Sequence, residues 1–283
     1  MRSFSAINPL RSYLSSFKSQ GQSIGLVPTM GALHDGHKEL VQNSLNENEC
    51  TVVSVFVNKA QFNNPDDYSN YPDQVEKDLQ ILEALKCDVV FKPTDAIMYP
   101  SSTPLRFDFG PLETVMEGEF RPGHFSGVGL VVSKLLNIVT PDRAYFGQKD
   151  IQQCAVIKKL VADLNFPVDI RVVPTVRDKN GLALSSRNLL LTEEERIIAS
   201  DIHGILSAAR DMLLDKTNSI SETKEVVIQR FKDHKDLNLE YFEVVSSQTL
   251  LPIKIIEEGE QTSLCIAAFI GNVRLIDNIY LFD

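Results

Sequence analysis

The sequence predicts an α/β protein, a Rossmann-like doubly wound parallel sheet followed by a smaller C-terminal α+β domain. Over the first 175 residues, short apolar runs alternate with longer segments of helical periodicity. This alternation is typical of parallel strands joined by crossover helices. In the rest of the chain, two helical segments precede three strand-like ones, an order typical of a small α+β domain. We therefore expect a first domain over residues 1–175 and a second over residues 176–283.

The strands expected in the first domain are apolar runs too short to be helices. They cover residues 24–28, 51–57, 89–92, 143–146 and 169–174. The helices expected between them cover residues 38–46, 71–85, 128–139 and 151–164. Because ligands of such sheets bind at the carboxyl ends of the strands, polar residues that follow these runs are the first candidates for a site.

The second domain is expected to open with a helix capped by Thr192, since three glutamates follow Thr192 in the first turn. A second helix is expected near residues 221–231, with Ser221 as its cap. Strands are expected near residues 239–245, 263–269 and 273–280.

Composition excludes two classes of partner. The net charge is −10, whereas a nucleic-acid surface needs a basic face. No apolar run is long enough for a membrane span, and the N-terminal segment lacks the apolar core of a signal peptide. The four cysteines are scattered, without a C-x-x-C pair. We expect a cytoplasmic protein with buried, reduced thiols and no nucleic-acid or membrane partner.

The most informative motif follows the first strand, where His34 and His37 lie three residues apart at the start of a predicted helix. Residues at this spacing share a helix face, and a helix start offers N–H groups and a partial positive charge. Imidazoles there can bind phosphate oxygens, which predicts a nucleoside triphosphate site without a P-loop or G-x-G-x-x-G sequence. Zinc is an alternative that lacks a third ligand nearby, and many H-x-x-H pairs are ordinary surface or packed histidines.

Three further segments carry polar groups near strand ends. Asn58 and Gln61 follow the second strand, and their amides can bind hydroxyls and a carboxylate, although Asn58 alone could simply form a turn. Asp78 could ligate Mg²⁺, although an isolated acid on a helix is more often solvated. The glycines of residues 117–129 predict a mobile loop that could cover a site, and His124 within it could instead only cap the next helix.

Two last segments add positive charge. Lys149 is a mobile point charge suited to phosphate, Asp150 is placed to cap the next helix, and Gln153 could face the same pocket as Gln61. The run Ser185-Ser186-Arg187 combines hydroxyls, backbone N–H groups and a guanidinium, which together can clamp a phosphate.

Together, in this order, the segments PTMGALHDGH, FVNKAQF, YPDQVEKDL, FRPGHFSGV, YFGQKDIQQ and LSSRN resemble the pantothenate synthetase (pantoate–β-alanine ligase) family of the HIGH-type nucleotidylyltransferase superfamily. The resemblance covers nearly the whole chain. One departure is Lys59, which stands where the family usually has proline and leaves Asn58 and Gln61 in place.

The resemblance implies an ATP-dependent, AMP-forming ligase that condenses (R)-pantoate with β-alanine through pantoyl adenylate. It implies catalytic roles in the phosphate cradle for His34, His37, Lys149, Ser185, Ser186 and Arg187. It implies an ATP site of Pro28, Thr29, Met30, Gly31, His34, Gly36, His37, Phe146, Gly147, Lys149, Asp150, Val176, Leu184, Ser185, Ser186 and Arg187. It implies a pantoate site of Met30, Asn58, Gln61, His124 and Gln153.

The resemblance also implies that Asp78 ligates Mg²⁺, that the small domain covers the active site, and that the enzyme is a homodimer. Two other functions stay open from the residues alone. One is an adenylyltransferase of the same superfamily without the ligation step, and the other is a nucleotide-binding module without turnover. The pairing of Gln61 with Gln153 and the extra C-terminal domain favour the ligase.

Overall fold

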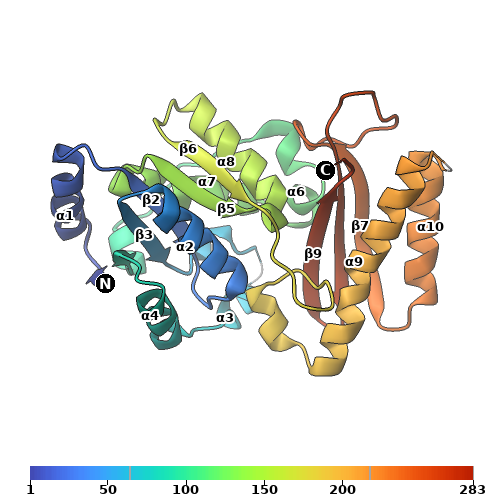
Figure 1. Ribbon diagram of the computed structural model, residues 1–283, viewed down its shortest axis with the longest axis horizontal. Coiled ribbons are helices and arrows are strands. Elements are labelled where there is room, and N and C mark those ends of the chain that lie inside the picture. Colours follow the sequence, from blue (N-terminus) through green and yellow to red (C-terminus); the bar gives the residue numbers. More distant parts are fainter. Residues whose placement is uncertain (64, 217, 283) are drawn as a thin grey trace. The chain divides into compact units, whose positions relative to one another are not determined.

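The computed structural model describes residues 1–63, 65–216 and 218–282 (Figure 1). The chain divides into two compact units. The first comprises Met1–Gly147 and Val156–Pro174, and the second comprises Gln148–Ala155 and the chain from Thr175 onward. The predicted first domain was continuous to residue 175, whereas residues 148–155 group with the second unit.

The first unit contains a parallel sheet, as the alternating pattern predicted. Its strand order is β1-β4-β3-β2-β5-β6, and every pairing is parallel. The strands are β1 (Arg2–Phe4), β2 (Ile24–Thr29), β3 (Cys50–Val55), β4 (Val89–Phe91), β5 (Arg143–Gly147) and β6 (Asp169–Val173). The strands β2 and β3 are almost wholly buried, which explains why they read as continuous apolar runs.

Helices flank this sheet. They are α1 (Ile7–Ser19), α2 (Asp35–Glu47), α3 (Pro65–Ser69), α4 (Val75–Ala84), α5 (Asp95–Met98), α6 (Glu117–Phe120) and α7 (His124–Val139), with 3₁₀ turns η1 (Lys59–Gln61) and η2 (Gly110–Glu113). The turn η3 (Gln148–Asp150) belongs to the second unit, and α8 (Ile151–Asp163) belongs to the first unit from Val156 onward. Helix α2 lies across β2 and β3 (Figure 1). Gly25 permits this close approach, because a Cβ there would lie 2.2 Å from Ser44 Oγ.

The strand order reverses direction between β2 and β5, since the chain winds from β2 to β3 and β4 on one side and from β5 to β6 on the other. Pairing between β2 and β5 stops at Leu26 and Ala144, before either strand ends. Pro28 lies beyond this last pair, where its missing N–H costs β2 no bond to β5. The carboxyl ends of strands at such a reversal are where open α/β sheets bind ligands.

The second unit contains α9 (Glu193–Leu214), α10 (Ile220–Asp233) and an antiparallel sheet of β7 (Leu237–Ser246), β8 (Thr262–Ile270) and β9 (Val273–Tyr280). Both helices pack against this sheet (Figure 1). Thr192 caps α9 in a reciprocal capping box with Glu195, as predicted. The predicted cap of the next helix, Ser221, was wrong. The cap is Ser219, which pairs with Glu222 at capping-box spacing.

All four cysteines are buried thiols, as predicted. Burial raises the pKa of both Cys50 and Cys87 to about 12, so these thiols stay protonated and are poor nucleophiles at neutral pH. Within the described ranges, no helix combines the length and apolarity that crossing a membrane requires.

Candidate active site

The two histidines of the first motif form a reciprocal cap at the start of α2. The backbone N–H of Gly36 donates to His34 Nδ1 at 3.2 Å, and the N–H of His34 donates to His37 Nδ1 at 3.4 Å. The ring centroids are 4.1 Å apart. Because both Nδ1 atoms accept, each neutral ring carries its proton on Nε2. The start of α2 thus carries two imidazole rings, each of which can donate a hydrogen bond through Nε2.

The loop between β2 and this helix is held by buried groups. Asp78, only 1% exposed, accepts from the backbone N–H of Ala32 at 2.9 Å and of Leu33 at 2.8 Å, one on each carboxylate oxygen. Thr29 Oγ1 accepts from the N–H of Gly31. Gly31 and Ala32 both have positive φ, a backbone conformation that is unfavourable for alanine. The hydrogen bonds from Asp78 and Thr29 stabilise the loop in this conformation.

The predicted metal role of Asp78 stays a prediction. Its carboxylate is buried and each oxygen accepts from a backbone amide, so Asp78 shapes the loop before His34. Within the part of the chain that the structure describes, no group of three or more His, Cys, Asp or Glu side chains could hold a metal ion.

The amides of Asn58 and Gln61 form one connected group in the first unit. Asn58 Nδ2 donates to Gln61 Oε1 at 3.1 Å and to the Gly127 carbonyl at 3.2 Å. Gln61 Nε2 lies 3.2 Å from Met30 Sδ. Asn58 is 1% exposed and its amide orients Gln61, while its predicted contact with substrate stays a prediction. Gln61 and Met30 remain candidates for that contact.

His124 also has a supporting role, while its predicted substrate contact stays a prediction. Its Nδ1 donates to the backbone carbonyl of Gln61 at 2.7 Å, and its Nε2 accepts from Arg121 at 3.2 Å. The side chain is 6% exposed. His124 thus fixes the backbone of η1 from the first turn of α7, whose N-cap is Gly123.

The predicted mobile cover over residues 117–129 was wrong, because this segment forms α6 and the start of α7. Its glycines serve close packing. A Cβ on Gly127 would lie 2.2 Å from the Ala60 carbonyl oxygen, and one on Gly118 would lie 2.6 Å from the Glu113 backbone. Helix α7 therefore rests directly on η1, the turn that carries Gln61.

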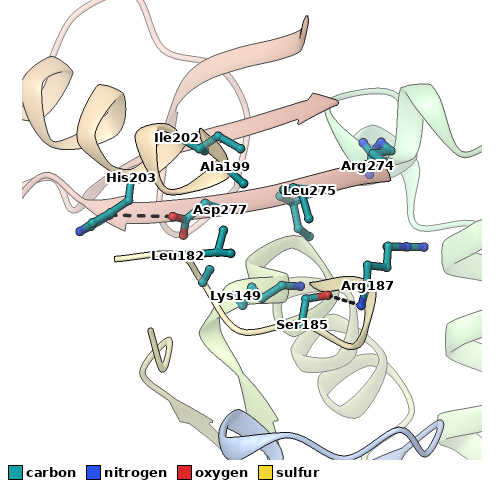
Figure 2. Close-up of a pocket in the computed structure, with 12 residues that line it drawn as sticks. Lys149, Leu182, Ser185, Arg187, Ala199, Ile202, His203, Arg274, Leu275 and Asp277 are labelled. Atoms are coloured by element: carbon teal, nitrogen blue, oxygen red, sulfur yellow. Dashed lines mark hydrogen bonds and ion pairs between the residues drawn. The ribbon is translucent and has the colours of Figure 1, made fainter. Parts of the chain in front are cut away.

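The second unit has a recess of its own (Figure 2). Three predicted phosphate-binding residues line it: Lys149, Ser185 and Arg187. Its other lining residues are Leu182, Ala183, Ala199, Ile202, His203, Arg274, Leu275, Ile276 and Asp277. In Figure 2 the side chains of Lys149 and Ser185 point toward one another, while Arg187 extends away from Lys149. The recess is basic although the chain as a whole is acidic, and such a local field attracts anions.

Strand β9 holds the turn that carries Lys149. Asn278 Nδ2 donates to the carbonyls of Gln148 at 3.0 Å and Lys149 at 2.9 Å, and Asn278 is 2% exposed. Nothing in the local sequence of Lys149 pointed to Asn278, which lies far along the chain. Only the polar pair Asp277-Asn278 inside an apolar strand could have drawn attention to it.

A buried ion pair lies beside Asn278. Arg177 donates two parallel bonds to Asp277, at 2.6 and 2.9 Å. His203 Nδ1 is 3.8 Å from the same carboxylate. Burial, reinforced by the Arg177 charge, lowers the pKa of His203 below its usual value. His203 is therefore neutral at neutral pH, and its contact with Asp277 is not an ion pair there.

The remaining predicted residues fall into two groups. In the first unit, Pro28 lies in β2, Phe146 and Gly147 end β5, and Gly36 lies in the first turn of α2. In the second unit, the N–H of Leu184 donates to the carbonyl of Val176 at 3.0 Å, which joins two predicted ATP residues across a short hairpin. Ser185 caps η4 (Ser186–Leu190), Asp150 ends η3, and Gln153 lies half-buried in α8.

The chain is similar to known proteins over almost its whole length. The family model for pantoate-beta-alanine ligase matches residues 2–280. Pantothenate synthetase from Bacteroides fragilis is 47% identical over 282 residues, covering 99% of this chain and 98% of that protein.

Two solved structures are similar over the whole chain. Pantothenate synthetase from Thermus thermophilus has a TM-score of 0.92 at 39% identity and is covered completely. Pantoate-beta-alanine ligase from Francisella tularensis, solved with beta-gamma ATP and beta-alanine, has a TM-score of 0.83 at 38% identity, with 98% of it covered. The chain belongs to the pantoate-beta-alanine ligase family.

Proposed function

We propose that this chain condenses (R)-pantoate with β-alanine at the expense of ATP, giving pantothenate, AMP and pyrophosphate. The observation that carries the proposal is the histidine pair at the start of α2, whose Nδ1 atoms are both tied to backbone N–H groups. The pair follows β2, one of the two strands between which the sheet reverses. Fixed N–H donors at a helix start suit phosphate oxygens.

In the first step, a carboxylate oxygen of pantoate attacks the α-phosphorus of ATP. The new P–O bond gives pantoyl adenylate, and the bond to the bridging oxygen breaks to release pyrophosphate. His34 and His37 donate through Nε2 to phosphate oxygens and stabilise the charge that grows on the leaving group. The tautomer is fixed before ATP arrives, so no reorganisation is needed during the reaction.

Four further residues are proposed to bind the nucleotide phosphates. Lys149 and Arg187 contribute cations, and Ser185 and Ser186 contribute hydroxyls, to the binding of the nucleotide phosphates. Phe146, Gly147, Asp150, Val176 and Leu184 complete the proposed ATP contacts together with the residues of the β2 loop.

In the second step, the neutral amine of β-alanine attacks the acyl carbonyl of the adenylate. The acyl C–O bond to AMP breaks, the amide C–N bond forms, and the amine loses a proton. The side chains proposed to bind pantoate are those of Gln61, Met30 and Gln153. A neutral amide orients the attacking carboxylate without the strong pairing that an arginine would impose.

We also propose a Mg²⁺ requirement, a homodimer and a cytoplasmic location. The described side chains offer no cage for a resident ion, so Mg²⁺ would arrive with the triphosphate, as is usual for this ion. The four buried thiols suit a reducing compartment. Analytical ultracentrifugation tests the dimer.

A product assay tests the function. With ATP, Mg²⁺, pantoate and β-alanine, we expect AMP, pyrophosphate and pantothenate in equal amounts, and no pantothenate when any one substrate is left out. Transfer of the nucleotide to pantoate with no amide product would indicate an adenylyltransferase, and nucleotide binding without pyrophosphate would indicate a binding module. Either result would contradict the ligase.

A further inference from the structure

A half-buried tyrosine completes the amide group at Gln61. Tyr99 follows α5, and its hydroxyl lies 2.7 Å from Asn58 Oδ1, the shortest hydrogen bond that Asn58 makes. No sequence motif pointed to Tyr99. Its ring is held separately, by Phe56 at 6.3 Å between centroids and by the Lys134 ammonium at 5.2 Å from the ring centroid.

Two backbone groups determine which way the Asn58 amide faces. The N–H of Ala60 can only donate, and it lies 3.4 Å from Oδ1. The carbonyl of Gly127 can only accept, and it lies 3.2 Å from Nδ2. With Oδ1 fixed as the acceptor, the Tyr99 hydroxyl must donate to it. Burial raises the pKa of Tyr99 to about 12, so this donor is present throughout the neutral range.

The orientation of Asn58 in turn determines that of Gln61. Asn58 Nδ2 donates to Gln61 Oε1 at 3.1 Å, so the Gln61 amide turns its NH₂ group toward Met30 Sδ, 3.2 Å away. A thioether is a weak acceptor. The NH₂ group would therefore exchange this contact for a hydroxyl or carboxylate oxygen.

We propose that Tyr99 is a positioning residue that acts through Asn58 to hold Gln61 as a hydrogen-bond donor toward the hydroxy acid substrate. The inference depends on the proposed function, because it assigns the substrate that receives the Gln61 bond. Without the Tyr99 hydroxyl, Asn58 Oδ1 keeps only the long contact with Ala60. The buried Asn58 amide then moves toward a better partner, and Gln61 loses its fixed orientation.

The test variant is Tyr99→Phe, which keeps both ring contacts and removes one oxygen. We expect the KM for pantoate to rise about tenfold, while the KM for ATP changes less than about twofold. The matched control is Tyr145→Phe. Tyr145 is a buried residue, and its hydroxyl bonds Asn48 and Glu47 at the opposite end of α2 from the histidines. Loss of this hydroxyl should therefore lower stability and leave the pantoate KM unchanged.

A double-mutant cycle separates positioning from a general structural effect. If Tyr99 acts through Gln61, then Tyr99→Phe should add almost nothing to the pantoate KM in a Gln61→Ala background. An unchanged pantoate KM in Tyr99→Phe, an equal rise for pantoate and ATP, or additive effects in the cycle would each overturn the proposal. Failure of the wild-type enzyme to use pantoate would instead overturn the proposed function.

Discussion

Substitution of Gly127 by alanine tests how closely α7 must approach the turn that carries Gln61. The added Cβ would lie 2.2 Å from the Ala60 carbonyl oxygen, whereas ordinary contact begins at 3.4 Å. The helix and the turn must therefore separate by about 1 Å, the difference between these two distances. A displacement of this size at a substrate-positioning group costs about 10²-fold in rate, and overpacking costs roughly 1–3 kcal/mol of stability.

We expect Gly127→Ala to lower kcat/KM for pantoate by about 10²-fold and to lower Tm by roughly 4–8 °C. Steady-state kinetics with pantoate varied, together with thermal unfolding, measure both effects. The control is Gly204→Ala in α9, where an added Cβ meets nothing within 4 Å, so this change should stabilise the helix slightly. Wild-type pantoate kinetics and Tm in Gly127→Ala would refute the packing argument.

Three further predictions concern other parts of the molecule. His37→Ala should slow adenylate formation by about 10²-fold or more, and a near-normal rate of ATP–pyrophosphate exchange would contradict its phosphate role. Asn278→Asp places a carboxylate against the carbonyls of Gln148 and Lys149, so we expect the KM for ATP to rise about tenfold with the pantoate KM unchanged. Equal ATP kinetics in the variant and the wild type would show that β9 does not position Lys149. Burial lowers the pKa of His203 below 6.5. As the pH falls below 6.5, His203 therefore takes up a proton more readily in the unfolded chain than in the folded one. The free energy of unfolding decreases over that pH range as a result. His203→Gln should therefore flatten the dependence of Tm on pH between about 7 and 5, and a slope equal to that of the wild type would count against this linkage.

The parallel sheet was predictable because its central strands are buried on both faces. Such strands read as unbroken apolar runs, and the observed bounds of β2 and β5 differ from the predicted ones by one residue. Strand β1 and helix α1 were not predicted. Strand β1 has three residues that are mostly exposed, and α1 buries only Leu10 and Leu14, so neither carries a strong apolar pattern.

Within the site, contacts between residues close in the sequence could be predicted, and contacts between residues far apart in the sequence could not. The spacing of His34 and His37 predicted a helix start, and the structure shows that each ring caps the turn through Nδ1. The sequence of residues 56–62 predicted that Asn58 and Gln61 belong together. It could not show that Tyr99 lies against Asn58, because that contact joins residues 41 positions apart.

The structural roles of Asp78 and of the glycines of residues 117–129 were not predicted, for a common reason. A carboxylate can bind a metal or a backbone N–H group, and a glycine can provide mobility or close packing. The choice depends on what lies opposite the residue in space. For Asp78 the partners are the amides of Ala32 and Leu33, and for Gly127 the neighbour is the backbone of Ala60.

The central claim is that the chain activates the carboxylate of pantoate by transfer of AMP before the amine takes part. Pantoate-dependent exchange of labelled pyrophosphate into ATP, measured without β-alanine, tests it most directly. We predict that exchange requires pantoate. Addition of β-alanine should then consume the adenylate and give AMP and pantothenate. An absence of exchange, or exchange that proceeds equally well without pantoate, would contradict the account.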